Sequence, residues 1–276
     1  MKKIAYIIAI MVGVLGACTE NEMTGAELKS ASLLSVAADG STSVKLTQLN
    51  AVLAGEETEL SEEELAGLIW MREEEKLAGD LYQAFYGLYD WRIFGNISRS
   101  ESTHVAAVLR LFDLFGIEDS TPDEVGVFAN ADIQKLYEDL KTSGEVSLVE
   151  ALKVGAYVEE LDILDLEERL EATSNADIQL VYENLLRGSR NHLRAFTRVL
   201  AQNDVYYQPL LLSDDYFNEI VEGAMERGSQ NGNCALGYGY ANRNGNNNRA
   251  QYNSEDCEGN PQNGVGGQQK RYRGGN

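Results

Sequence analysis

The chain has 276 residues, a formal net charge of −21 and a pI of about 4.4. This charge argues against a nucleic-acid partner, because binding to a phosphate backbone needs a basic surface. The three prolines and the lack of clear alternation between apolar and polar residues favour helices over strands. The length allows one or two domains.

The N-terminal sequence predicts a secretory signal. A basic start precedes an apolar run, residues 4–17, which ends in small residues directly before Cys18. Small residues before a cysteine resemble the lipobox of bacterial lipoproteins, which implies cleavage before Cys18 and a lipid on its sulfur. We interpret residues 1–18 as a signal peptide with a lipobox, and we expect a lipid-anchored protein of the bacterial cell envelope, in the inner or the outer membrane. The alternative is a plain signal peptide with an incidental cysteine.

The segment after the signal is expected to be a tether. Residues 19–57 are rich in serine, threonine, alanine and glutamate, and they show no sustained hydrophobic period. We interpret them as a disordered link between the lipid and the folded domain, with a little helix near residues 47–53. The folded domain is expected over residues 58–223.

The first strong helix is predicted from Ser61, where a glutamate three residues later completes a capping box. Glu75 falls on the buried face of this helix, whereas Glu73 and Glu74 are expected on its other sides, toward solvent. The face itself is predicted from apolar residues that recur in steps of three and four: Leu68, Met71, Ala78, Tyr82 and Phe85.

The second helix carries a Glu-x-x-His pair. The chain is expected to break at residues 95–96, a Gly-Asn pair, and the helix is predicted over residues 97–115. Glu101 and His104 lie three residues apart, so both can reach the same point from one helix face. Glu101 has an alternative role in a capping box with Ser98. The histidine on the same face favours a metal-ligating pair.

The third long helix contributes one glutamate from an adjacent pair. It follows a long connection, residues 117–146, which contains short helices, one of them starting at Asn130. The helix itself is predicted over residues 147–172. Glu159 continues its apolar face and Glu160 is one step away, so we expect one of the two to point inward. The sequence leaves open which one.

The fourth long helix is predicted over residues 175–201. Ser189 and His192 lie on its apolar face, and His192 is the second of only two histidines in the chain. A last short helix is predicted over residues 213–227. Both histidines therefore belong to buried faces of long helices.

The C-terminal segment, residues 228–276, is a low-complexity tail rich in asparagine and glycine. It has too few apolar residues to offset the entropy of ordering, so we expect disorder. Cys234 and Cys257 could form a disulfide in an oxidising envelope compartment. Metal binding is the weaker interpretation of these cysteines, because no histidine is near them in the sequence.

Two helical hairpins joined by one long crossover have the connectivity of ferritin-like bundles. We therefore expect an all-α, ferritin-like four-helix bundle. Metal sites in that fold use Glu on two helices and Glu-x-x-His on the other two. The resemblance is carried by Glu75 with Tyr82, Glu101 with His104, Glu159 or Glu160, and Ser189 with His192, where serine replaces the usual glutamate.

The same region also resembles an uncharacterised bacterial family, the domain of unknown function 2202, which is classed as ferritin-like. The match covers about residues 58–223. It is carried by three stretches, residues 72–78, 159–163 and 185–192. This resemblance implies a fold and a set of site residues, and it supplies no activity.

The residue types predict a divalent metal, either as a di-iron or related dinuclear site or as a single ion; a metal-free polar network is the alternative. Carboxylates and imidazoles together suit iron, with manganese and zinc as alternatives. Several buried glutamates without a cation would be costly, since each ion must leave water. The expected ligands are Glu75, Glu101, His104, Glu159 or Glu160, and His192, with Tyr82 and Ser189 beside them.

This site suits an oxidoreductase that oxidises Fe(II) or reacts with O₂ or peroxide. Two alternatives are a non-catalytic metal-binding or interaction module at the cell envelope and a purely structural bundle. Whether the protein is an enzyme therefore stays open. The expected partners are the membrane, through the lipid on Cys18, and the metal ion. No nucleic acid is expected, and the sequence points to no particular protein partner.

Overall fold

The computed structural model describes residues 33–55 and 59–227. Three predictions fall outside these residues: the lipobox at Cys18, the disulfide between Cys234 and Cys257, and the disordered C-terminal tail. Within the described ranges, no helix combines the length and the apolar composition that a membrane span requires.

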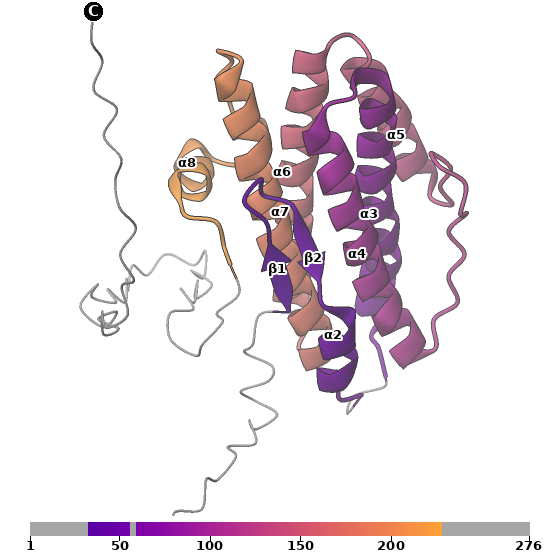
Figure 1. Cartoon of the computed structure of the whole chain (residues 1–276). Coiled ribbons are helices and arrows are strands. Elements are labelled where there is room, and N and C mark those ends of the chain that lie inside the picture. Colours follow the sequence, from indigo (N-terminus) through magenta and orange to yellow (C-terminus); the bar gives the residue numbers. More distant parts are fainter. Residues whose placement is uncertain (1–32, 56–58, 228–276) are drawn as a thin grey trace, which may run out of the picture.

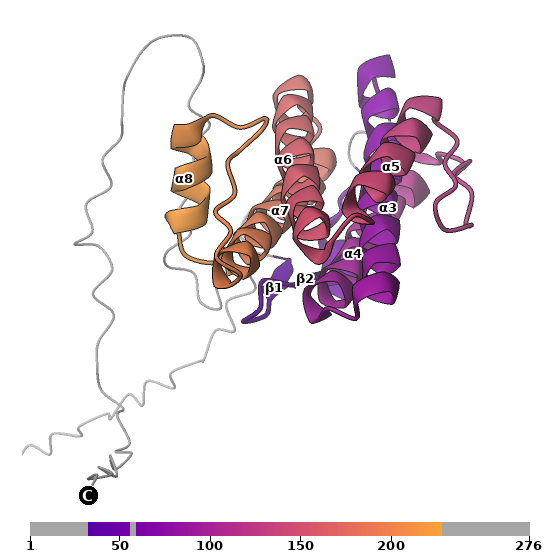
Figure 2. The ribbon, with the colours of Figure 1, turned by 90° about the horizontal axis from the view of Figure 1, so that it is seen from above.

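The fold is an all-α bundle, as predicted. Its long helices are α3 (Glu62–Tyr89), α4 (Arg92–Phe115), α6 (Leu148–Ala172) and α7 (Ala176–Gln202). Helix α3 packs against α4, and α6 packs against α7, so the bundle consists of two helical hairpins. The hairpins meet where α3 contacts α6 and α4 contacts α7. Figure 2 shows the two pairs lying side by side.

The predicted helix starts are confirmed by their caps. Ser61 forms the expected capping box with Glu64. Ser147 accepts a hydrogen bond from the backbone N–H of residue 150. Asn130 and Asn175 each accept from two backbone N–H groups of the first helical turn. These side chains satisfy donors that a helix N-terminus leaves unpaired.

The predicted break at residues 95–96 is wrong. The chain turns at Asp90, which has a left-handed backbone with φ 49°, and α4 begins at Arg92. Gly95 lies inside the helix, where a Cβ would come within 3.1 Å of the Tyr86 ring. The glycine therefore permits close helix packing. Ser98 is also in the helix interior and donates to the backbone of α3, so it does not form a capping box with Glu101.

The long crossover carries α5 (Ala131–Gly144), which packs against α3 and α6. Figure 1 shows the connection running along the outside of the bundle. Glu73, expected toward solvent, is only 2% exposed and accepts hydrogen bonds from the backbone N–H groups of Ala129 and Asn130. This carboxylate therefore fixes the crossover against α3.

The prediction that residues 19–57 form a disordered tether is wrong for residues 33–55. They form an antiparallel hairpin of β1 (Leu34–Val36) and β2 (Thr42–Val44), followed by α2 (Leu46–Val52), which matches the short helix predicted near residues 47–53. The hairpin packs against α4 and α7 (Figures 1 and 2). Four scattered apolar side chains are buried there, too few to create a visible period: Leu33, Leu34, Val44 and Leu49.

The last short helix, α8 (Asp214–Glu222), follows its N-cap Ser213, where the predicted helix begins, and ends before the predicted limit, residue 227. Beyond it, the carboxylate of Glu226 lies 2.5 Å from Arg190 and 2.9 Å from Arg194 on α7. These ion pairs hold the segment after α8 against the bundle.

Candidate metal centre

The centre consists of five buried side chains from all four long helices. Each is at most 1% exposed. Two groups of three have ligand atoms close enough to hold a metal ion: Glu75, Glu101 and His104, and then Glu101, Glu159 and His192. The structure thus brings together Glu75, Glu101, His104, Glu159 and His192.

Glu101 belongs to both groups of three, which form the two halves of the centre. Its Oε2 lies 2.8 Å from Nδ1 of His104, and its Oε1 lies 2.9 Å from Nδ1 of His192. The outer carboxylates complete each half, with Glu75 3.1 Å from the His104 Nδ1 and Glu159 3.4 Å from the His192 Nδ1. Glu101 therefore presents one carboxylate oxygen to each of the two groups.

Several ligand atoms in this cluster have no hydrogen-bond partner among the described residues. They are Glu75 Oε1, Glu101 Oε1, Glu159 Oε2 and His192 Nδ1, all buried. Buried polar atoms are normally paired. The His192 Nδ1 and Glu101 Oε1 are close together, but their geometry makes no hydrogen bond. Unpaired lone pairs that converge in this way fit divalent cations that accept them.

Thr42, which sequence reasoning missed, orients both imidazoles. Its Oγ1 lies 3.1 Å from Nε2 of His104 and 3.0 Å from Nε2 of His192. The two rings are stacked, 5.4 Å apart and tilted by 17°. If the hydroxyl oxygen accepts from both Nε2–H groups, both Nδ1 atoms are left to face the carboxylates. A hydrogen bond to the distal nitrogen is how proteins set the tautomer of a ligating histidine. Thr42 lies in the segment interpreted as a tether, and no motif marks it.

Replacing Thr42 by valine should weaken metal binding about 10- to 100-fold. Valine has nearly the same shape as threonine, but it leaves both Nε2–H groups without their acceptor. The affinity for Mn(II) can be measured by calorimetry. Thr42→Ser keeps the hydroxyl and should bind almost as well as the unchanged chain. Equal affinity in Thr42→Val would show that the hydroxyl has no such role.

Tyr82 contacts the cluster, and the hydroxyl of Ser189 is bonded elsewhere. The Tyr82 hydroxyl donates to Glu159 Oε1 at 2.6 Å. The Ser189 hydroxyl donates to the backbone carbonyl of Leu185, so α7 supplies an imidazole and no carboxylate. Gly188 leaves room for the neighbouring ring, because a Cβ there would lie 2.5 Å from His104 Cε1.

Glu160 is not part of the centre. Its carboxylate accepts hydrogen bonds from the Tyr207 hydroxyl at 2.6 Å and from the backbone N–H groups of residues 210–212. Adjacent residues on a helix point about 100° apart, so Glu159 and Glu160 cannot face the same site. The inward glutamate is Glu159, and Glu160 holds the segment between α7 and α8.

The metal-free cluster holds protons near neutral pH. Burial raises the pKa of Glu75 to about 7, because leaving water disfavours a charged carboxylate. Burial alone would lower the pKa of His192, but the charges of Glu101 and Glu159 outweigh it and raise the pKa to about 9. Burial alone would raise the pKa of Glu101, but the charges of His192 and His104 outweigh it and hold that pKa below its usual range. A bound metal would displace the protons on Glu75 and His192.

The fold and site define a helical-bundle protein with a buried carboxylate–histidine cluster. Comparison with known families shows which family the chain belongs to. The family model described as "Uncharacterized protein domain (DUF2202)" matches residues 64–224, and the chain belongs to this family.

An uncharacterized protein of Methanocaldococcus jannaschii, MJ0754, is 48% identical over 170 residues, which is 61% of this chain and 92% of that protein. The crystal structure of hypothetical protein MJ0754 from Methanococcus jannaschii is similar, with a TM-score of 0.60 and 47% identity. That likeness covers 61% of this chain and 97% of the crystallised chain.

Proposed function

We propose that this protein binds a pair of divalent metal ions, iron first, in the centre that Glu101 bridges. The observation that carries the proposal is the convergence of unpaired, buried ligand atoms on two adjoining positions. Manganese and zinc are alternatives for the same ligand types. The resemblance of the residues before Cys18 to a lipobox supports a lipid-anchored location at the cell envelope.

The charge of the deprotonated cluster suits two divalent ions. Three carboxylates that are at most 1% exposed would strongly disfavour the folded state unless cations or protons compensate their charge. With both imidazoles neutral, two divalent ions would change the net charge from that of three carboxylates to about +1. The missing carboxylate on α7, where Ser189 stands, keeps this residual charge positive.

An iron pair at this site would supply one-electron redox chemistry toward O₂ or peroxide, so we propose Fe(II) oxidation as the activity. The chain's own groups would hold and shield the ions. Glu75, Glu101 and Glu159 provide oxygen ligands, and Tyr82 donates to Glu159. The ring of Tyr82 packs against Phe94 and Phe196, which helps to keep water out.

Elemental analysis of residues 19–276, purified without added metal, tests the proposal. We expect about two metal equivalents per chain, and an oxygen- or peroxide-dependent change in absorbance after Fe(II) is added. A count near zero, together with unchanged melting after chelation, would contradict a metal centre. The hairpin must be retained in any shorter chain, because Thr42 contacts both histidines.

A second candidate is a metal-binding module without turnover. It is favoured by the complete burial of the ligands beneath the hairpin, since ions held this way could serve to stabilise the bundle. Metal-dependent stability with no consumption of O₂ or peroxide would select this function over oxidation.

Stabilisation by metal should increase as the pH rises from about 6 to about 8.5. Glu75 and His192 have raised pKa values in the folded, metal-free chain. Their contribution to metal-free stability is complete below the unfolded values and is lost as the pH rises through about 7 and about 9. Metal binding needs both groups deprotonated, so affinity rises over the same range. Melting temperatures with Mn(II) and with chelator, compared across this range, check the prediction. A difference that shrinks with pH would contradict it.

A further inference from the structure

A row of carboxylates on α6 continues outward from the metal centre. Glu159, Asp162 and Asp165 follow one another at intervals of three residues, close to one helical turn. Glu159 and Asp162 are both 0% exposed, and Asp165 is half-buried. The row therefore passes from the interior of the bundle toward its surface.

This row faces α3. At its inner end, Glu159 accepts a hydrogen bond from Tyr82 of α3 at 2.6 Å. At its outer end, Asp165 accepts one from the indole N–H of Trp70 of α3 at 2.9 Å. Asp162 lies between these two positions on the same side of α6, so its carboxylate enters the interface with α3. Glu74 of α3 joins the row there, since its Oε2 lies 3.2 Å from the same indole nitrogen.

Asp162 is the unsatisfied member of the row. Neither of its carboxylate oxygens has a hydrogen-bond partner among the described residues, and both are buried. An unpaired buried carboxylate costs several kcal/mol unless a proton or a cation neutralises it. Burial, together with the negative charges of Glu74 and Glu75, raises the pKa of Asp162 well above its usual range. Its surroundings therefore favour a positive charge.

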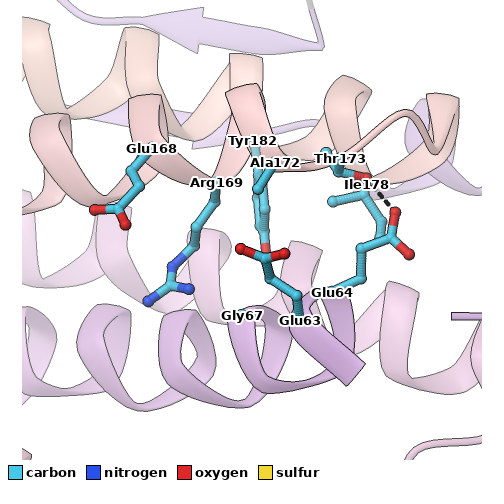
Figure 3. A pocket seen from close by; sticks show the side chains of 9 residues that line it. All are labelled: Glu63, Glu64, Gly67, Glu168, Arg169, Ala172, Thr173, Ile178 and Tyr182. Atoms are coloured by element: carbon cyan, nitrogen blue, oxygen red, sulfur yellow. Dashed lines mark hydrogen bonds between the residues drawn. The ribbon is translucent and has the colours of Figure 1, made fainter. Parts of the chain in front are cut away.

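The outer end of the row adjoins a small surface pocket. Arg169 lies over the Trp70 ring, 5.9 Å from its centroid, and also lines this pocket. Figure 3 shows Glu168 and Arg169 extending from α6 toward α3, which contributes Glu63 and Glu64 to the same pocket. An acidic pocket beside the row can collect cations from solvent.

We propose that Asp162, with Glu74 and Asp165, forms a transit site through which divalent cations pass from this pocket to the metal centre. The inference rests on the proposed function, because it needs a centre to be filled. Carboxylate oxygens bind hard divalent cations such as Mn(II) and Fe(II). The ion would be passed from Glu74 and Asp165 to Asp162, and then to Glu75 and Glu159.

The test is the rate at which the metal-free full chain takes up Mn(II), followed through the loss of the free-ion electron paramagnetic resonance signal. Asp162→Asn keeps the shape and removes the charge. We expect uptake at least about 10-fold slower than in the unchanged chain, with the same final count of two ions. Asp139→Asn, on the exposed face of α5, is the matched control and should load at the unchanged rate.

Asp165→Asn keeps the proposal falsifiable if Asp162→Asn does not fold, because Asp165 is only half-buried. It should also slow uptake. Loading at the unchanged rate in the folded variants would overturn the transit site, and it would indicate that Asp162 is neutralised by a proton. An unchanged chain that binds neither Mn(II) nor Fe(II) would overturn the proposed function itself, so the two failures are distinguishable.

Discussion

Replacing Glu101 by glutamine should empty both metal positions. Each half of the centre would lose one of its three candidate ligands, because Glu101 offers one oxygen to each. The negative charge of Glu101 also offsets the repulsion between the two cations, and glutamine would remove that charge. We expect the metal content to fall from about two equivalents to near none, and the affinity to fall by more than about 100-fold. Elemental analysis and calorimetry measure these two quantities.

Variants of Glu75 and Glu159 test whether Glu101 serves both metal positions or only one. Glu75→Gln and Glu159→Gln each alter one half only, so each should retain about one equivalent. Glu160→Gln is the matched control, since it changes a buried glutamate next to Glu159 that contacts neither half. A Glu101→Gln protein that still holds two ions would contradict the bridging role.

Glu160→Gln should have a large effect on stability and none on metal content. The Glu160 carboxylate accepts hydrogen bonds from the Tyr207 hydroxyl and from three successive backbone N–H groups. Glutamine keeps one carbonyl oxygen and places an amide donor against those N–H groups. Charge-assisted hydrogen bonds contribute about 1.5–3 kcal/mol each, and their losses are not additive. We expect the free energy of unfolding to fall by about 2–4 kcal/mol and the melting temperature by about 10 °C.

Thermal unfolding of the metal-loaded chain measures this change. Glu150→Gln is the surface control, because its ion pair with Lys153 is about 40% exposed. That substitution should change stability by less than about 0.5 kcal/mol. If the Glu160→Gln protein has the same melting temperature as the unchanged protein, the carboxylate does not anchor residues 207–212. If this variant loses metal while remaining folded, the assignment of Glu159 as the inward glutamate is contradicted.

The long helices and most of the centre were predictable because helical periodicity is a local property. Steps of three and four residues determine which side chains share a face, and this was enough to place Glu75, Glu101 and His104 inward. Capping side chains such as Ser61 act on residues within one turn, so helix starts were predictable too. The misplaced start of α4 had a different cause. Gly95 serves the close packing of Tyr86, a contact that no local pattern reveals.

The sequence alone determined that amphipathic helices would bury carboxylates and both histidines, because a helix face is defined by nearby residues. The tertiary structure alone decided which groups meet across helices. It selected Glu159 over Glu160 and brought Thr42 from the hairpin to both imidazoles. It also left Asp162 beside α3 with no hydrogen-bond partner among the described residues. Contacts of this kind join residues far apart in the chain. They depend on how whole elements pack and on where the backbone donors of one segment meet the side chains of another.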